Sequence, residues 1–459
     1  MTWNAAAGYR LVWRWHFYAG LFVAPFMLIL SVSGLVYLFN DEINDALQAE
    51  KRFVAPTSQM LPLSRIADAA LTGYPGGKVT RLDTPRAVDR SVEVYVTPAS
   101  GKPVRVFVDP GRGTVLGSHD YTTTVIGIAD QIHGSLFMGD FGDAIVELAA
   151  CWGFILLATG MYLWWPRGQI GVWRALVPRW GWKGRPFWRS LHASLGIWTS
   201  FLAMFLILTG LPWATIWGGM FRQATEMAGI GYPTSFRGYG SPSSNTPSIG
   251  AETGHAAPWT LAEAPAPRSG GHGGHAHGIQ SAAHGSGPIG LDRVAGIIEA
   301  RGMKPPYRLN LPKDGRGVYI SFTYPDRPEG QRSLYIDQYS GAVLGDVGFG
   351  DYGWAAKAIE LGIQLHMGNY FGRLNQVVMA LPCLGLIGLA LTGPYMWWRR
   401  RPNVGMGAPQ APVHLRARSV AAILLVLGIV FPLAGISLVA VLLLDCAWRR
   451  TIKKEVAIG

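Results

Sequence analysis

Two stretches of sequence decide the fold: HGSLFMGDFGD at residues 133–143 and HMGNYFGRLNQ at residues 366–376. Each places a histidine just before a long apolar segment. About 20 apolar residues are enough to cross the roughly 30 Å hydrocarbon core of a bilayer. Outward from these stretches the sequence contains four such segments, at residues 17–39, 144–165, 195–217 and 374–398. The sequence therefore predicts an α-helical integral membrane protein with histidines at helix ends.

The charge distribution predicts the topology. The chain has 459 residues, of which only 15% are charged, and a formal net charge of +12. Much of the basic excess lies in two short loops without acidic residues, 167–188 and 399–418. Short basic loops face the cytoplasm, so we expect a cytoplasmic N-terminus and two large outside segments. The expected partner of the basic residues is the lipid bilayer, and no nucleic acid is expected.

The first and last apolar segments lie near the two ends of the chain. No cleavage site follows the first apolar segment, so we expect it to stay as an anchor. The last apolar stretch, 419–448, is interrupted by Pro432 and has basic residues on both sides. We expect a single kinked helix there, with a helical hairpin as the alternative.

The outside segments predict two small α+β modules, each with one helix followed by alternating, β-branched strands. Their ends match closely, as VDPGRGTVLG at 108–117 and IDQYSGAVLG at 336–345. Each end is typical of a strand, a glycine-containing turn and a short return strand.

The whole chain shows the same duplication. His16 precedes Gly34 by 18 residues, as His192 precedes Gly210, and both outer histidines precede a glycine by 27 residues. The distance between the two histidines of a half is 117 residues in the first half and 174 in the second. Most of the extra 57 residues form a Gly/Ser/Pro/His-rich insertion at about 238–288, which we expect to be a disordered loop.

The duplication predicts a linear order of segments. These are transmembrane helix 1 (1–40), module 1 (41–122), an outer histidine segment with helix 2 (123–166), a basic loop (167–188), helix 3 (189–218), module 2 (219–365), an outer histidine segment with helix 4 (366–398), a second basic loop (399–418) and the C-terminal segment (419–448).

Four histidines occupy equivalent positions in this repeat. A pseudo-two-fold axis along the membrane normal would bring His16 opposite His192, and His133 opposite His366. Two facing imidazoles between helices suit b-type haem, so we expect two b haems per chain. A porphyrin face needs helix surface without side chains, which Gly20 and Gly196 could supply for the inner haem and Gly34 and Gly210 for the outer one. Close helix packing is the alternative role of these glycines.

Other candidate ligands are weaker. No C-x-x-C-H motif is present, so covalent haem attachment is excluded. The insertion could bind metal or be an inert linker. Outside the repeat, we expect His414 to be structural, and His119 is the only substitute outer ligand. The weak metal-site candidates in the insertion are His255, His272, His275, His277 and His284.

Several motifs resemble those of the PepSY-associated transmembrane proteins, a family that includes inner-membrane ferric-siderophore reductases of Gram-negative bacteria. The resemblance covers nearly the whole chain. It implies two periplasmic PepSY-like modules and haem ligation by His16, His133, His192 and His366. The motifs that carry it are WRWHFYAGLFVAPFMLILSVSGLVYLF, QIHGSLFMGDFG, ATGMYLWWPR, RSLHASLGIW, QLHMGNYFG and LTGPYMWWRRRP.

The expected function is electron transfer across the bacterial inner membrane. Electrons from a cytoplasmic flavoprotein or from quinol would reach the inner haem, then the outer haem, then a ferric siderophore or another metal complex. The chain has no G-x-G-x-x-G following a strand, so the donor is a separate protein or quinol. Two other classes stay open. A metal transporter usually has ionisable residues near mid-bilayer, whereas Glu147 lies near a segment end, and a non-enzymatic envelope metal-binding or regulatory protein would be colourless.

Overall fold

The computed structural model describes residues 5–57, 59–167, 171–239, 243, 246–254, 256–269, 287–401, 407 and 417–444. The chain forms two compact units. The membrane unit consists of Met1–Leu38, Ala129–Phe221 and Gln376–Gly459, and the sheet unit of Phe39–Ile128 and Arg222–Asn375.

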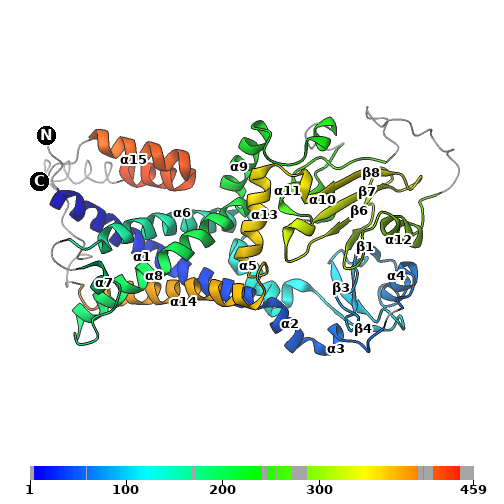
Figure 1. The fold of residues 1–459 in the computed structure, drawn as a ribbon, viewed down its shortest axis with the longest axis horizontal. Coiled ribbons are helices and arrows are strands. Elements are labelled where there is room, and N and C mark those ends of the chain that lie inside the picture. Colours follow the sequence, from blue (N-terminus) through cyan, green and yellow to red (C-terminus); the bar gives the residue numbers. More distant parts are fainter. Residues whose placement is uncertain are drawn as a thin grey trace, which may run out of the picture. The chain divides into compact units, whose positions relative to one another are not determined.

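Four long apolar helices make up most of the membrane unit (Figure 1). Their apolar spans have mean hydropathies of 1.8 to 2.2 and are long enough to cross a bilayer. The predicted multi-pass membrane protein is therefore confirmed. The helices are α1 (Ala5–Leu38), α6 (Gly139–Trp164), α8 (Arg185–Gly210) and α14 (Arg373–Trp398).

Neighbouring helices of the unit are antiparallel. α1 packs on α6 and α6 packs on α8. α14 approaches α8 closely, since a Cβ added to Gly388 would lie 2.6 Å from the Leu195 side chain. α1 and α8 therefore run in the same direction. We call the end of the unit where α1 begins the Ala5 end, and the end where α1 finishes the Leu38 end.

The third span begins and ends earlier in the sequence than the predicted segment, 195–217. α8 ends at Gly210, a 3₁₀ turn follows at Leu211–Trp213, and a separate helix, α9 (Thr215–Met227), begins after it. Pro212 has no amide hydrogen to continue the α-helical ladder. Trp217, expected in the transmembrane segment, therefore belongs to α9.

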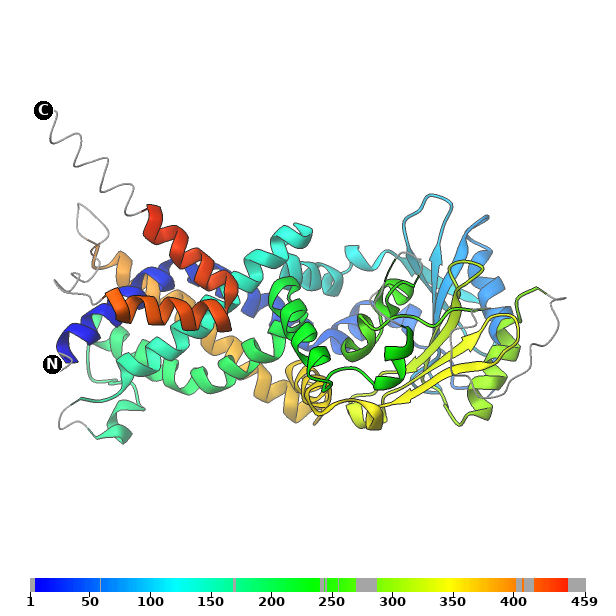
Figure 2. The ribbon, with the colours of Figure 1, turned by 90° about the horizontal axis from the view of Figure 1, so that it is seen from above.

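The C-terminal segment is a helical hairpin, so the expected single kinked helix is wrong. α15 (Ala417–Val430) is followed by a second apolar helix at Pro432–Leu444. A Cβ added to Gly435 would lie 2.5 Å from the Cα of Gly428, whereas seven residues along one helix span about 10 Å. The chain turns back between these arms (Figures 1 and 2). Over the residues that the structure describes, each arm is about 20 Å long, less than the hydrocarbon core of a bilayer.

The sheet unit contains one antiparallel sheet of eight strands in the order β4-β3-β2-β1-β5-β6-β7-β8. Each half of the sheet has a helix followed by four strands. The first half consists of α4 (Leu63–Leu71), β1 (Lys78–Asp83), β2 (Val92–Thr97), β3 (Val104–Val108) and β4 (Val115–His119), and the second of α12 (Leu291–Ala300), β5 (Arg308–Asn310), β6 (Val318–Thr323), β7 (Arg332–Asp337) and β8 (Val343–Gly348).

The two halves meet at β1 and β5, where Leu82 pairs with Leu309 and both side chains are fully buried. A single apolar core contains residues of both halves. The flanking helices also touch, since the Ser64 hydroxyl donates to Asp292 Oδ2 over 2.6 Å. The two predicted α+β modules thus share one sheet and one core.

The matching strand ends have the predicted form. Asp109 Oδ1 accepts from two backbone amides of its turn, and Asp337 Oδ1 does the same in the second half. Gly113 and Gly341 have φ angles of 71° and 75°, a left-handed backbone that favours glycine.

Part of the insertion is ordered, which corrects the expectation of a disordered loop. It forms α10 (Ile249–Thr253) and α11 (Trp259–Ala262). Ile249 and Leu261 are buried in a second apolar core together with Tyr335 of β7. Apolar residues among the polar ones therefore cover the sheet, while residues 270–286 lie outside the described part of the chain.

Other short elements complete the described chain. They are α2 (Asn40–Leu47), α3 (Ala49–Arg52), η1 (Tyr121–Thr123), α5 (Val125–Ser135), α7 (Val172–Ala175), η3 (Thr234–Tyr239), η4 (Pro328–Gly330), η5 (Phe349–Asp351) and α13 (Trp354–His366).

Candidate functional site

His16 of α1 is held against α6 near the Ala5 end of the membrane unit. Its Nδ1 lies 2.9 Å from Thr159 Oγ1. The next residue, Gly160, leaves space for the ring, because a Cβ there would lie 3.2 Å from His16 Cε1. A hydroxyl and a bare helix surface thus fix this imidazole from two sides.

His192 of α8 is held against α14 in the same way. Its Nδ1 lies 2.8 Å from Thr392 Oγ1, and a Cβ on Gly393 would lie 3.6 Å from its Cε1. His16 and His192 thus have equivalent surroundings, each with a threonine hydroxyl at Nδ1 and a glycine beside the ring. Their pairing across the membrane unit stays a prediction.

His133 of α5 is held against α1 near the Leu38 end. Its Nδ1 lies 3.1 Å from Ser33 Oγ and 3.0 Å from the Leu30 carbonyl oxygen. A Cβ on Gly34 would lie 2.9 Å from His133 Cε1. The contact between imidazole, hydroxyl and glycine therefore recurs at a third histidine.

The hydrogen bonds favour Nδ1 as the protonated nitrogen of each imidazole. The hydroxyls of Ser33, Thr159 and Thr392 each donate to a carbonyl one turn earlier in their own helix. A hydroxyl has one hydrogen, so its oxygen accepts from the histidine Nδ1–H. In a neutral ring the lone pair is then on Nε2, the nitrogen available to a metal. Histidines that bind metals are usually held in this manner through their other nitrogen.

His366 is the last residue of α13 and is half-buried. It belongs to the sheet unit. In the sequence, Thr209 and Gly210 stand in the second repeat where Ser33 and Gly34 stand in the first. Thr209 Oγ1 donates to the Phe205 carbonyl over 2.8 Å, the same bond within the helix that the other three hydroxyls make.

The four predicted glycines differ in their surroundings. The missing side chain of Gly34 leaves room for an imidazole. Cβ atoms on Gly20 and Gly196 would make ordinary contacts of 3.7 and 3.8 Å with leucine side chains. Gly210 ends α8. Space for a porphyrin at these glycines stays a prediction.

The three histidine-bonding hydroxyls were missed by sequence reasoning, although a signal was present. A serine or threonine precedes the glycine at each repeated helix position: Ser33–Gly34, Thr159–Gly160, Thr209–Gly210 and Thr392–Gly393.

The remaining candidate histidines lie in the sheet unit or outside the described residues. His119 ends β4 in the sheet unit, where its ring lies 5.1 Å from that of Phe107 between centroids. Its Nδ1 is buried and, within the described part of the chain, has no hydrogen-bond partner. The other candidates, His255, His272, His275, His277, His284 and His414, lie outside the described residues.

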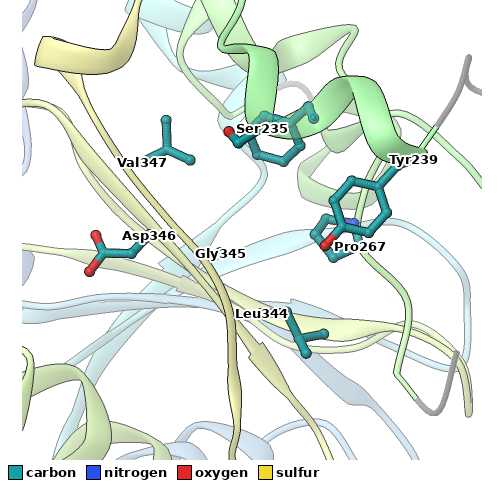
Figure 3. Close-up of a pocket in the computed structure, with 8 residues that line it drawn as sticks. Ser235, Tyr239, Pro267, Leu344, Gly345, Asp346 and Val347 are labelled. Atoms are coloured by element: carbon teal, nitrogen blue, oxygen red, sulfur yellow. The ribbon is translucent and has the colours of Figure 1, made fainter. Parts of the chain in front are cut away.

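A small cavity lies in the second half of the sheet unit (Figure 3). Its volume is about 70 Å³, and it is lined by Tyr239, Pro267 and residues of β8. That volume corresponds to about two water molecules. It is therefore too small for a porphyrin or a ferric siderophore, and none of the candidate histidines lines it.

The fold and the held histidines define a class: a multi-pass helical membrane protein that presents imidazole nitrogens between its helices. The family model of the PepSY-associated TM region matches residues 13–400, and the chain belongs to this family. No curated protein matches the chain.

Proposed function

We propose that the protein is a membrane electron-transfer protein that binds two b haems and reduces ferric complexes. His16 and His192 would hold one haem, and His133 and His366 the other. The substrate would be a ferric siderophore or another metal complex in the periplasm. Electrons would come from a cytoplasmic flavoprotein or from quinol.

The observation that carries the proposal is the hydrogen bond between a threonine hydroxyl and Nδ1 in both His16 and His192. A ring that donates from Nδ1 has its lone pair on Nε2. This donor set suits an iron with two axial imidazoles, so the residues present fit the cofactor.

The chain's own residues would orient the cofactors and keep water away. The hydroxyls fix each ring plane and raise imidazole basicity through the Nδ1–H bond. The surrounding helices are apolar, which excludes water. When bound, haem would supply one-electron chemistry, and ligation by two histidines would suit it to electron transfer.

Reduction releases iron because Fe(II) binds hard oxygen ligands less tightly than Fe(III). The protein would lie in a bacterial inner membrane. Its basic loops favour an N-terminus on the cytoplasmic side and the sheet unit in the periplasm. In that orientation His16 and His192 are nearest to the electron donor.

The test is a dithionite-reduced minus air-oxidised visible spectrum with quantification of haem. We expect about two b haems per chain, and loss of one in His16→Ala. The matched control is His119→Ala, which changes a histidine of the sheet unit and should keep both. A colourless protein from haem-replete cells would exclude the proposal in favour of an envelope metal-binding protein or a transporter.

A further inference from the structure

A carboxyl group is buried within the span of α6. Glu147 is 1% exposed. The sequence placed it near a segment end, but α6 begins earlier, at Gly139, so Glu147 lies eight residues, roughly 12 Å, into the helix. An ionisable side chain at such a depth is costly unless it has a function or a partner.

One oxygen of this carboxyl has partners. Glu147 Oε2 accepts from the backbone amides of Ile216 and Trp217 over 3.0 and 3.2 Å. One turn earlier, Asp143 Oδ2 accepts from the amide of Thr215 over 2.8 Å. These amides form the first turn of α9, whose partial positive charge favours a carboxylate.

The other oxygen, Glu147 Oε1, is buried and has no hydrogen-bond partner among the residues that the structure describes. The hairpin covers this region, since Phe431 and Ala434 pack with Cys151 and Leu211 in one buried cluster. Trp217 fixes the hairpin tip by donating its indole N–H to the Val430 carbonyl over 2.9 Å. An oxygen without a donor in an apolar enclosure favours the protonated form, whereas the α9 amides favour the charged form.

The carboxyl is level with the histidine site near the Leu38 end. A Cβ on Gly153 of α6 would lie 3.1 Å from Met27 Sδ of α1. Because the helices are antiparallel, six residues from Met27 toward the Leu38 end of α1 correspond to six residues from Gly153 toward the start of α6. This register brings Ser33, the partner of His133, level with Glu147.

We infer that Glu147 is a proton-binding site coupled to reduction of the haem proposed at His133. The inference rests on the proposed function. When one electron arrives at that level, the added negative charge favours uptake of one proton by the Glu147 carboxylate. The electron comes from the donor described above and the proton from water. The carboxylate becomes a carboxylic acid. When the electron leaves, the carboxylic acid releases the proton to water and is a carboxylate again.

The other titratable groups around Glu147 are few. Asp143 and Cys151 lie one turn to either side on α6, and His133 lies at the same level. Residues 211–217 and 427–437, which form the 3₁₀ turn, the start of α9 and the hairpin tip, contain no ionisable side chain. Among these groups, Glu147 is thus the buried one whose protonation should respond most directly to an added electron at the level of His133.

The experiment is a redox titration of the full-length, haem-loaded protein between pH 6 and 8. The haem near His133 is identified as the component lost in His133→Ala. Its midpoint potential should fall with rising pH, with a limit of about 59 mV per unit for one proton per electron. Glu147→Gln keeps an acceptor oxygen for α9 and should abolish the slope. Asp143→Asn, the matched control on the same helix, should retain it.

A potential that is independent of pH in the unmodified protein, or a slope kept by Glu147→Gln, would overturn the inference. A protein without haem would instead overturn the proposed function. Redox-induced infrared spectra provide a second readout on the unmodified protein labelled with ¹³C-glutamate. A carboxylic-acid band that appears on reduction and shifts with the label supports proton uptake, and the absence of such a band contradicts it.

Discussion

At the scale of the residue, the Thr159 hydroxyl has a role that packing alone would not give it. It donates to its own helix and accepts from His16, so the His16 lone pair is on Nε2. Thr159→Val has a similar shape but no acceptor. If the proposed haem binds at His16 and His192, this change should weaken its binding about 10- to 100-fold, the usual effect of removing such a partner. Haem titration into the apoprotein measures it, and Thr159→Ser should restore affinity. Equal affinity in the valine and serine variants would show that the hydroxyl does not matter.

Two glycines of α1 provide a matched pair. A Cβ on Gly34 would lie 2.9 Å from the His133 ring, whereas one on Gly20 would meet a leucine methyl at 3.7 Å. Gly34→Ala should therefore cost about 1–3 kcal/mol of stability through overpacking. Gly20→Ala should be neutral or stabilising, because alanine favours a helix. Thermal melting of the two variants checks this, and the reverse order of stability would contradict it.

His119 should make the stability of the sheet unit depend on pH below neutrality. Burial, with the nearby charges of Arg105 and Lys51, lowers the pKa of His119 to about 4. Between its usual pKa of 6.5 and this value, the unfolded chain binds more protons than the folded one, so stability falls as pH falls. His119→Gln should reduce the loss of melting temperature from pH 7 to pH 4.5 by a few degrees. An unchanged difference would contradict this assignment.

The sequence predicted the histidines but not what holds them, for a physical reason. Their repeat spacing is a property of the chain itself, and it is visible without a structure. The partner of His133 is Ser33, 100 residues away on another helix. Such a pairing depends on how far each helix is rotated and shifted along its neighbour, which the apolar pattern of a membrane helix does not define. Only the recurrence of Ser or Thr before Gly pointed to it.

At the scale of the element, the hairpin resolves the charge pattern around the C-terminal segment. Two arms that turn back leave both ends on one side of the membrane, which agrees with basic residues flanking both ends. Pro432 predicted an interruption, but a proline permits either a kink or a turn. The turn is favoured by the close approach that Gly428 and Gly435 allow.

The hairpin makes a topological prediction. In a variant without native cysteines, Ala417→Cys and Leu444→Cys should both react with a membrane-impermeant maleimide from the same side. Phe431→Cys, at the buried tip, should be protected from either side and serves as the control. Reaction of the first two cysteines from opposite sides would mean that the segment crosses the membrane once.

At the scale of the whole molecule, the two halves of the sheet depend on each other. Leu82 is fully buried at the seam between β1 and β5, within the core that both halves share. Leu82→Ala should cost about 2–5 kcal/mol and reduce hydrogen-exchange protection in β2 and β6 alike. Val88→Ala, at an exposed position of the first half, should change little. Loss of protection in β2 alone would mean that the halves unfold independently.

The strands of both halves were predictable from the alternation of apolar and polar residues. That the two halves form one sheet was not predictable. A pairing of β1 with β5 joins residues more than 200 positions apart, and either strand would serve as well at the edge of a separate sheet. The order of α10 and α11 was hidden for a similar reason. Their few apolar residues lie among glycines, serines and prolines, and they become structural only when a sheet face is present to bury them.

The seam between β1 and β5 also bears on a chain with a single repeat. Leu82 and Leu309 pair at its centre, and Ser64 meets Asp292 at corresponding places of the two helices. Such a chain would expose β1 as a further open strand edge, and open edges attract another copy. Two copies would close the same seam about a two-fold axis, which is the arrangement of an isologous homodimer. With both halves in one polypeptide, formation of the seam is independent of protein concentration.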